Sequence, residues 1–410
     1  SLAVEESVAG AEANDKRMCQ DYRPWLYLYA SDMKVLLDAT AIPANLGGVG
    51  RYVDDLVPCL VSQGVNLALA VQSRDAEHFA ARAPRAHIIT VPHLLERRPV
   101  RMAWEQSGLP ALVRKWRPDV LHCPHYTYPT RLALPNVGVA VTLHDATFFS
   151  HPQAHSPLKQ RYFTAAITRA SNHADALIVP SIATRDESIK YAGGSPENYF
   201  VAYHGVDTKR FYPVSDAERE RVAASLGLAG QPYIGFLGTL EPRKNVPALV
   251  RAWVQAFSQQ PNPPALVLAG GKGWDEEIEP ALAGVPSHMR VLRPGYLPLE
   301  DLPGFLSGCQ VLAYPSVGEG FGLPVLEAMA CGAAVLTTRE LSLPEVGGDA
   351  VAYCEPDVDS IAEALSSLSA DATLRQQLGA AAQKRASEFT WQRAAVEHIK
   401  AYEYAAAAKA

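Results

Sequence analysis

Residues 318–332 read GEGFGLPVLEAMACG, and the interpretation of the whole chain starts from this stretch. Pro324 follows a glycine-rich turn, which predicts the first turn of a helix. The free N–H groups and positive dipole end of such a helix suit a phosphate. Glu319 and Glu327 bracket seven residues, and carboxylates accept hydrogen bonds from vicinal hydroxyls of a sugar or ribose. The stretch therefore predicts a site for a ligand with phosphates and polyols, such as a nucleotide sugar. The alternative is a solvated helix after a glycine turn.

The composition is typical of a soluble globular enzyme. With 410 residues the chain is long for one hydrophobic core, which predicts two domains. A net charge of -6 gives no argument for nucleic acid as a partner. No apolar run approaches the roughly 20 residues that a membrane-spanning helix needs. Six scattered cysteines without a CxxC pair argue against a zinc site or a disulfide framework and fit a reducing cytoplasm; they are Cys19, Cys59, Cys123, Cys309, Cys331 and Cys354.

Short apolar runs alternate with helical patterns, and this alternation predicts an α/β fold with parallel sheets covered on both faces. The alternation breaks at residues 208–216 and then restarts, which predicts a domain boundary. Residues 1–32 are expected to form an extension before the fold starts at Met33. The expected strands are 35–37, 66–71, 87–90, 120–123, 137–142, 176–180 and 199–203 in the first series, and 233–238, 265–269, 291–292, 310–315 and 334–337 in the second.

A glycine loop follows the first expected strand, with the sequence Gly47-Gly48-Val49-Gly50-Arg51. Strand, glycine loop and helix together form a layout that lets the backbone approach a phosphate. The loop is not GxGxxG, and no acidic residue stands where a dinucleotide site would need it. The alternative is that the glycines serve only a tight turn.

Two further groups of polar residues follow expected strands. His144-Asp145 lies at a strand's carboxyl end, where ligands bind in open α/β sheets, and His144 could bond a sugar hydroxyl or polarise a leaving phosphate. Arg243 and Lys244 stand between a strand and a helix, where two cations can neutralise a diphosphate. The alternatives are a histidine satisfied by backbone and a solvated basic turn.

Two other patterns allow a functional and a structural interpretation. Residues 97–117 interleave basic residues with Trp104 and Trp116, which suits either an anionic lipid surface or a solvated helix face. Asp357-Val358-Asp359 spells DxD, a pattern that can bind a divalent metal. It precedes a helical pattern, so we interpret Asp357 as a helix cap.

Three of these pieces together resemble the family-4 retaining glycosyltransferases of GT-B fold, over residues 33–404. The pieces are the glycine loop at 47–51, the segment Gly238-Thr239-Leu240-Glu241-Pro242-Arg243-Lys244-Asn245, and Glu319-x7-Glu327 with its Gly-Phe-Gly-Leu-Pro filling. His144-Asp145 and His204-Gly205-Val206-Asp207 are similar to that family as well.

The resemblance implies two Rossmann-like domains that face each other across a cleft. Residues 33–210 would form the acceptor domain and 211–390 the nucleotide-sugar donor domain. A C-terminal helix within 391–410 would cross back to the first domain.

The resemblance also implies roles for individual residues. Glu327 would bind the donor ribose, and Glu319 the hydroxyls of the transferred sugar. Lys244 would hold the diphosphate, and His144 would meet the sugar. The remaining donor-binding positions are Gly47 and Gly48, which would close over the diphosphate, and Gly320, Phe321, Gly322 and Leu323.

The chain departs from the family at one position. Many members carry Arg directly after the strand's glycine, where this chain has Thr239, and Arg243 is expected to supply the missing charge. With Arg243, Lys244 and the helix start at Pro324 aimed at the leaving diphosphate, no metal or other cofactor is expected. Transfer would retain the anomeric configuration, and Glu319→Ala would abolish transfer while leaving the fold intact.

The Gly-Gly-Val-Gly-Arg-Tyr and Glu-Pro-Arg-Lys-Asn segments look like those of bacterial mannosyltransferases of polysaccharide and glycolipid assembly. GDP-mannose is therefore the expected donor, and a glycan or a lipid-linked glycan the expected acceptor. The expected location is the cytoplasm, with contact to the inner membrane face through residues 97–117. The alternatives are a UDP- or ADP-sugar transferase, a GT-B-fold sugar-nucleotide epimerase, and a non-catalytic nucleotide-sugar-binding protein.

Overall fold

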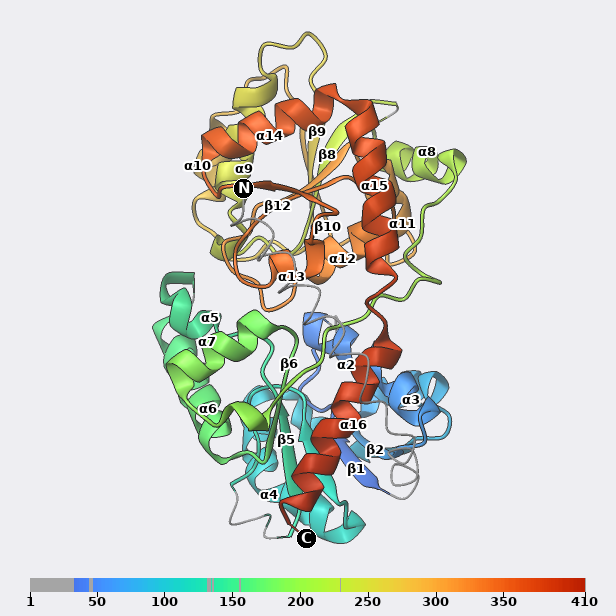
Figure 1. Cartoon of the computed structure of the whole chain (residues 1–410), viewed down its shortest axis with the longest axis vertical. Coiled ribbons are helices and arrows are strands. Elements are labelled where there is room, and N and C mark those ends of the chain that lie inside the picture. The colour runs from blue at the N-terminus through green and yellow to red at the C-terminus, as the bar shows by residue number, and fades with distance from the viewer. Residues whose placement is uncertain are drawn as a thin grey trace, which may run out of the picture.

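A computed structural model describes residues 33–43, 47–130, 134, 136–154, 156–228 and 230–409. The expected extension at 1–32 lies outside these residues. Within them the chain forms two lobes, one above the other in Figure 1, and each lobe is built on its own parallel sheet. The predicted α/β class with two Rossmann-like domains is confirmed.

The first sheet has seven parallel strands in the order β3-β2-β1-β4-β5-β6-β7. Strands β4, β5 and β6 are buried along their whole length, as expected of a sheet covered on both faces. The strands are β1 Lys34–Asp38, β2 Asn66–Gln72, β3 His87–Val91, β4 Val120–Cys123, β5 Gly138–Thr142, β6 Ala176–Val179 and β7 Tyr199–Val201, and the helices are α2 Gly47–Ser62, α3 Ala76–Arg82, α4 Arg98–Trp116, α5 Thr147–Ser150, α6 Pro157–His173 and α7 Ile182–Ala192.

The second sheet has six parallel strands in the order β10-β9-β8-β11-β12-β13. Its central strands β8 and β11 lead into the two charged segments of the predicted donor site. The strands are β8 Tyr233–Leu237, β9 Ala265–Ala269, β10 Val291–Gly295, β11 Val311–Tyr314, β12 Val335–Thr338 and β13 Ala352–Cys354, and the helices are α8 Asp216–Ser225, α9 Val246–Phe257, α10 Ile278–Ala283, α11 Leu302–Gly308, α12 Leu323–Ala330, α13 Leu343–Gly347, α14 Val358–Ala370 and α15 Ala372–Ala386.

The last helix, α16 (Trp391–Ala407), leaves the second domain and packs on the first, as the resemblance implied (Figure 1). Its apolar face joins the core formed by α2 and the first sheet. Two buried hydrogen bonds fix it there: Tyr402 Oη lies 2.9 Å from His122 Nδ1, and His398 Nε2 lies 2.6 Å from Tyr52 Oη. Because these groups are buried, each would be costly to leave without a partner.

The chain crosses between the domains twice, and the two crossings lie side by side. The Val206 N–H donates to the Phe389 carbonyl at 3.1 Å. A Cβ added at Gly205 would collide with the backbone at Trp391, so only glycine allows this approach. The resemblance had marked Gly205 without assigning a role, and the structure shows that it serves the contact between the two connections.

Candidate active site

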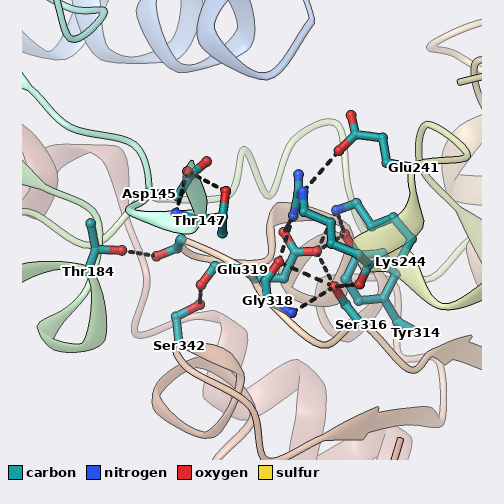
Figure 2. A network of polar contacts seen from close by, with 12 residues as sticks. Asp145, Thr147, Thr184, Glu241, Lys244, Tyr314, Ser316, Gly318, Glu319 and Ser342 are labelled. Atoms are coloured by element: carbon teal, nitrogen blue, oxygen red, sulfur yellow. Dashed lines mark hydrogen bonds and ion pairs between the residues drawn. The ribbon is translucent and has the colours of Figure 1, made fainter. Parts of the chain in front are cut away.

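Glu319 is the centre of a buried polar network at the carboxyl ends of β8 and β11 (Figure 2). Its Oε1 accepts hydrogen bonds from Lys244 Nζ at 2.5 Å and Ser316 Oγ at 2.7 Å. The Tyr314 hydroxyl donates to the same oxygen at 3.1 Å. The carboxylate is therefore nearly saturated with donors before any ligand arrives.

Arg243 holds the second oxygen of this carboxylate, with Nη1 2.8 Å from Glu319 Oε2. The same guanidinium donates to Glu241 Oε2 at 2.9 Å and to the Gly318 carbonyl at 2.7 Å. Arg243 thus lies beside Lys244 and Glu319, where the sequence expected it to supply the charge absent at Thr239. The two cations, Arg243 and Lys244, are thus matched by the two carboxylates of Glu319 and Glu241.

The electrostatics of the group follow from burial and from these partners. Burial alone would raise the pKa of Glu319, but Arg243 and Lys244 outweigh it and lower the pKa to about 2. The pKa of Lys244 is lowered, first by burial and then by Arg243, and Glu319 only partly offsets this. The carboxylate is therefore ionised throughout the physiological range, whereas burial and repulsion from Arg243 disfavour the charged form of Lys244.

The glycine turn before α12 has the geometry that the sequence predicts. Gly322 is the residue before the helix and has φ +98, a conformation that only glycine adopts without strain. Pro324 lies in the first turn, which leaves the amides around Leu323 directed out of the helix. The backbone at Gly320, Phe321 and Gly322 therefore lies between Glu319 and the helix start.

Glu327 lies one turn into α12 and is 2 % exposed. Its Oε1 forms an ion pair with Arg51 of α2, across the boundary between the domains. Its Oε2 is buried without a hydrogen-bond partner. A buried carboxylate oxygen without a donor is costly, so this atom is able to accept a hydrogen bond from a hydroxyl group.

Gly47 and Gly48 form the first turn of α2 instead of a free loop, and residues 44–46 before them lie outside the described part of the chain. Gly47 has φ +57, and a Cβ added at Gly48 would meet no atom within 4 Å. Open space therefore lies next to Gly48, on the helix that carries Arg51 to Glu327.

His144 follows β5 and is surrounded by aromatic side chains of the first domain. Its Nε2 lies 2.7 Å from the Pro124 carbonyl, so this nitrogen carries the proton and Nδ1 is the acceptor. The Tyr52 ring meets it edge-on with centroids 5.2 Å apart. Burial lowers the pKa of His144, so the neutral ring can accept a hydrogen bond from a hydroxyl group but does not supply positive charge.

The loops that carry His144 and Glu319 are in direct contact. A Cβ added at Gly320 would collide with the His144 carbonyl oxygen. A Cβ at Gly318 would lie 3.2 Å from the His151 ring, which also belongs to the first domain. The structure thus brings the predicted residues His144 and Glu319 onto two loops that meet between the domains.

Sequence reasoning missed three participants in this site. Tyr314 and Ser316 bond to Glu319, and Arg51 pairs with Glu327. Tyr314 and Ser316 were visible as polar groups at the end of an apolar strand. Arg51 was read only as part of the glycine loop.

Two surface hollows lie elsewhere and are lined by none of the predicted site residues. One of about 790 Å³ is lined mainly by α6, and another of about 920 Å³ lies between α8, α11 and α15. Within the described residues no group of three or more His, Cys, Asp or Glu side chains is arranged to hold a metal ion. Asp357 accepts from the Ser360 N–H at 2.9 Å, which confirms the helix cap.

Comparison with protein families matches both halves of the chain. Residues 46–210 match the model described as Glycosyltransferase Family 4, and residues 218–385 match Glycosyl transferases group 1. The chain belongs to the family-4 glycosyltransferases of GT-B fold. A glycosyltransferase is therefore the preferred interpretation of the site, ahead of a sugar-nucleotide epimerase and a non-catalytic nucleotide-sugar-binding protein.

Two curated relatives resemble this glycosyltransferase in sequence. The O-antigen chain mannosyltransferase B of Escherichia coli is 29% identical over 394 residues, which cover 90% of this chain and 99% of the relative. The D-inositol 3-phosphate glycosyltransferase of Corynebacterium jeikeium is 33% identical over 244 residues, covering 57% of this chain and 58% of the relative.

Solved structures confirm the fold of the glycosyltransferase. Sucrose-phosphate synthase from Thermosynechococcus elongatus has a TM-score of 0.74 at 22% identity and covers 92% of this chain and 100% of its own. Anabaena HepE in complex with UDP and glucose has a TM-score of 0.68 at 19% identity and covers 90% and 98%. At these identities the similarity shows a common fold, and it does not identify the sugar donor of this enzyme.

Proposed function

We propose that this glycosyltransferase moves mannose from GDP-mannose to a hydroxyl of a glycan or lipid-linked glycan, with retention at the anomeric carbon. The observation that supports the reaction is the pair of buried cations around Glu319, beside the start of α12. The choice of mannose is supported by the similarity to O-antigen chain mannosyltransferase B, which spans nearly the whole length of both proteins.

The donor diphosphate replaces part of the hydrogen bonding between Glu319 and the two cations, Arg243 and Lys244. Arg243 and Lys244 now bond to Glu319, and a diphosphate at the start of α12 competes for the same N–H groups. The negative charge that builds on the leaving diphosphate is stabilised by these cations and by the helix amides. This positive charge does the work that a metal ion does in other enzymes, and we propose that none is required.

Glu327 binds the ribose through Oε2, a buried oxygen without a hydrogen-bond partner in the protein. Glu319 has a smaller capacity for the sugar, because one of its oxygens already accepts three hydrogen bonds. It therefore acts mainly by aligning Arg243 and Lys244, and offers its second oxygen to one sugar hydroxyl. His144 Nδ1 accepts from another hydroxyl of the same sugar.

In the transfer step, the acceptor oxygen forms a bond to the anomeric carbon on the same face as the departing diphosphate. The bond from that carbon to the phosphate oxygen breaks, and the acceptor's proton passes to that phosphate oxygen. Contact between the domains around Gly320 and His144 excludes water, which limits hydrolysis of the donor.

The donor is tested by thermal shift against GDP, UDP, ADP and their hexose conjugates, in the presence of a chelator. Ligand at ~100 times Kd should stabilise the protein by about 2.7 kcal/mol. Stabilisation by GDP and GDP-mannose alone supports the proposal. Stabilisation by UDP or ADP compounds would show that the donor is a UDP- or ADP-sugar instead of GDP-mannose. Loss of all binding with chelator shows that a metal is needed. The one-bond carbon–proton coupling of the product's anomeric centre then decides between retention and inversion.

A lipid surface is the proposed location of the acceptor, based on α4. Arg97, Arg98, Arg114 and Lys115 are exposed there, whereas Trp104 and Trp116 pack partly against the core. Within the described residues no helix is long and apolar enough to span a bilayer. The surface would therefore hold the enzyme by charge.

Vesicle sedimentation tests this surface. Arg97→Glu/Arg98→Glu should reduce binding to anionic vesicles and leave binding to neutral vesicles unchanged. Arg101 is left intact because it pairs with the buried Glu105 at 3.3 Å, and its loss would disturb the fold. Absence of binding by the wild-type protein would end the proposal.

A further inference from the structure

Helix α7 of the first domain has its N-terminus capped from the second domain. Glu345 of α13 accepts the Ile182 N–H at 2.8 Å and the Ala183 N–H at 2.7 Å. The third amide of the helix, at Thr184, bonds to its own N-cap Ser181 at 3.0 Å. A carboxylate from another domain thus satisfies amides that a helix normally leaves to its own cap or to water.

The same helix start holds the loop that carries Glu319. Ser181 Oγ donates to the Gly320 carbonyl at 2.7 Å, and Thr184 Oγ1 donates to it at 3.1 Å. All three groups are buried. Side chains of the first domain therefore hydrogen-bond to the backbone of Gly320, one residue after Glu319 (Figure 2).

The second domain hydrogen-bonds to the neighbouring carbonyl of this loop, that of Glu319. Ser342 Oγ donates to the Glu319 carbonyl at 2.9 Å, and Ser342 is the residue before α13. Three residues later comes Glu345, whose Oε2 also accepts from the Tyr203 hydroxyl at 2.8 Å. Arg385 fixes the α13 backbone by donating to the Glu345 carbonyl at 2.7 Å.

These bonds form a closed ring that crosses between the domains twice. It runs from Glu319 to Gly320, to the start of α7, to Glu345, to Ser342 and back to Glu319. Neither crossing survives if the domains separate, because each joins one group from either side. The orientation of the Glu319 loop is thereby linked to the relative position of the domains.

We propose that Glu345 is a positioning residue that couples closure of the two domains to the orientation of the Glu319 loop. This inference rests on the proposed function of Glu319 for its catalytic consequence. With the ring closed, the loop of Gly320 and Glu319 keeps the position in which Glu319 pairs with Arg243. With the ring open, α7 has two unsatisfied amides at its positive end and the loop loses its hold from the first domain.

The test compares Glu345→Ala and Glu345→Gln with the wild-type enzyme. Glu345→Ala should lower kcat/KM for transfer by about 10- to 100-fold, because three charge-assisted bonds are lost, two from amides of α7 and one from the Tyr203 hydroxyl. It should also raise the fraction of donor that is hydrolysed instead of transferred, since a less closed site admits water. Glu345→Gln keeps one acceptor oxygen, so its kcat/KM and hydrolysed fraction should fall between those of Glu345→Ala and the wild type.

Asp371→Ala is the matched control. Asp371 caps α15 by accepting the Leu374 N–H at 2.8 Å, but cap and helix belong to one domain. It should lower the melting temperature and leave the ratio of transfer to hydrolysis unchanged. If Asp371→Ala and Glu345→Ala change that ratio equally, Glu345 is only structural and the proposal fails. Wild-type kinetics in Glu345→Ala would overturn it as well.

Small-angle scattering without ligand separates this inference from the proposed function. Glu345→Ala should have a larger radius of gyration than the wild type, and hydrogen exchange should increase at the start of α7 and at 318–322. That result supports the ring even if the wild type transfers no sugar, which would count against the function alone. An unchanged radius of gyration and unchanged exchange would overturn the ring.

Discussion

The two domains meet at one surface and supply opposite kinds of chemistry to it. The second domain contributes full charges, with Arg243 and Lys244 held around Glu319. The first contributes neutral rings, with His144 among Tyr52 and other aromatic side chains. Burial favours the neutral form of His144, whereas ion pairing keeps Glu319 charged.

Under the proposed function, this difference divides the work between the two domains. The second domain would hold the diphosphate with positive charge in a fixed buried network. The first would meet the sugar hydroxyls with a neutral acceptor among aromatic side chains. The predictions below test this division, from the largest expected effect to the smallest.

Removing the central carboxylate should affect stability as well as activity. Glu319→Ala leaves Lys244 buried without its counter-ion and leaves Arg243 paired only with Glu241, which costs about 3–5 kcal/mol in the free energy of unfolding. The sequence led us to expect an intact fold, and the buried ion pairs give a reason to expect otherwise. Glu319→Gln should lower kcat by roughly 1000-fold, because one oxygen that aligns the cations becomes an amide.

The double variant Glu319→Gln/Lys244→Met is the control for this charge argument. It removes one charge of each sign, so it should recover part of the unfolding free energy that Glu319→Gln loses, while transfer stays at or below the level of Glu319→Gln. Chemical denaturation measures the first quantity and a radiolabelled donor assay the second. Wild-type turnover in Glu319→Gln would remove Glu319 from the site.

The domains should respond to acid in sequence, the first before the second. Burial lowers the pKa of His398 from 6.5 to about 4, although the Ala394 carbonyl opposes the shift. A depressed pKa gives stability that is complete above pH 6.5 and is lost as the pH falls towards 4, about 3 kcal/mol in all. Glu319 gives a similar amount, lost only between its unfolded value of 4.5 and about 2.

Hydrogen exchange measured from neutral pH down to about pH 5 checks this order. Peptides of α2, β5 and α16 should lose protection before those of β8 and β11. His398→Gln keeps a hydrogen-bonding group beside Tyr52 but cannot be protonated there, so the first transition should move to lower pH. Earlier loss in the second domain would contradict the assignment of charge to the two domains.

Contact between the domains is tested by Gly320→Ala. The added Cβ would collide with the His144 carbonyl, so the domains cannot approach as closely. We expect kcat/KM for transfer to fall by about 100-fold, the usual cost of misplacing reacting groups by an ångström. Affinity for the nucleoside diphosphate by calorimetry should change little, because the second domain's cations remain.

Gly284→Ala is the control for this substitution. A Cβ there meets only the Ala281 carbonyl oxygen, at 3.5 Å, which is an ordinary contact within one domain. It should leave transfer unchanged. If Gly320→Ala lowers nucleotide affinity as strongly as it lowers transfer, the two domains do not divide the work in this way.

The sequence predicted the fold well where local pattern determines it. Buried strands are continuous apolar runs, so β1, β8 and β11 could be placed within a residue or two, and Gly322 marked the start of α12. Strand β13, which has three residues and is half-buried, carries no such pattern and was not predicted. Glycine and proline positions gave the loops because their backbone requirements are local.

Pairings across the domain boundary could not be predicted in this way. Nothing near Arg51 in the sequence shows that it meets Glu327, 276 positions later, and nothing near Glu345 points to α7. These contacts depend on how two separately folded sheets are placed, which one sequence does not encode in any local pattern. The charged groups of the site were predictable, but the partners that hold them were not.

Gly48→Ala has the smallest expected effect and tests whether the first domain contributes to donor binding. Gly48 is exposed in the first turn of α2, its φ is not strained, and an added Cβ meets no atom within 4 Å. Alanine in a helix is favoured over glycine by about 0.5–1 kcal/mol, so the protein should be no less stable. If the donor diphosphate approaches the backbone here, the methyl group should raise KM for the donor about tenfold, equal to 1.4 kcal/mol, with little change in kcat. Steady-state kinetics at varied donor concentration measure this, and an unchanged KM would show that the glycine serves only the turn.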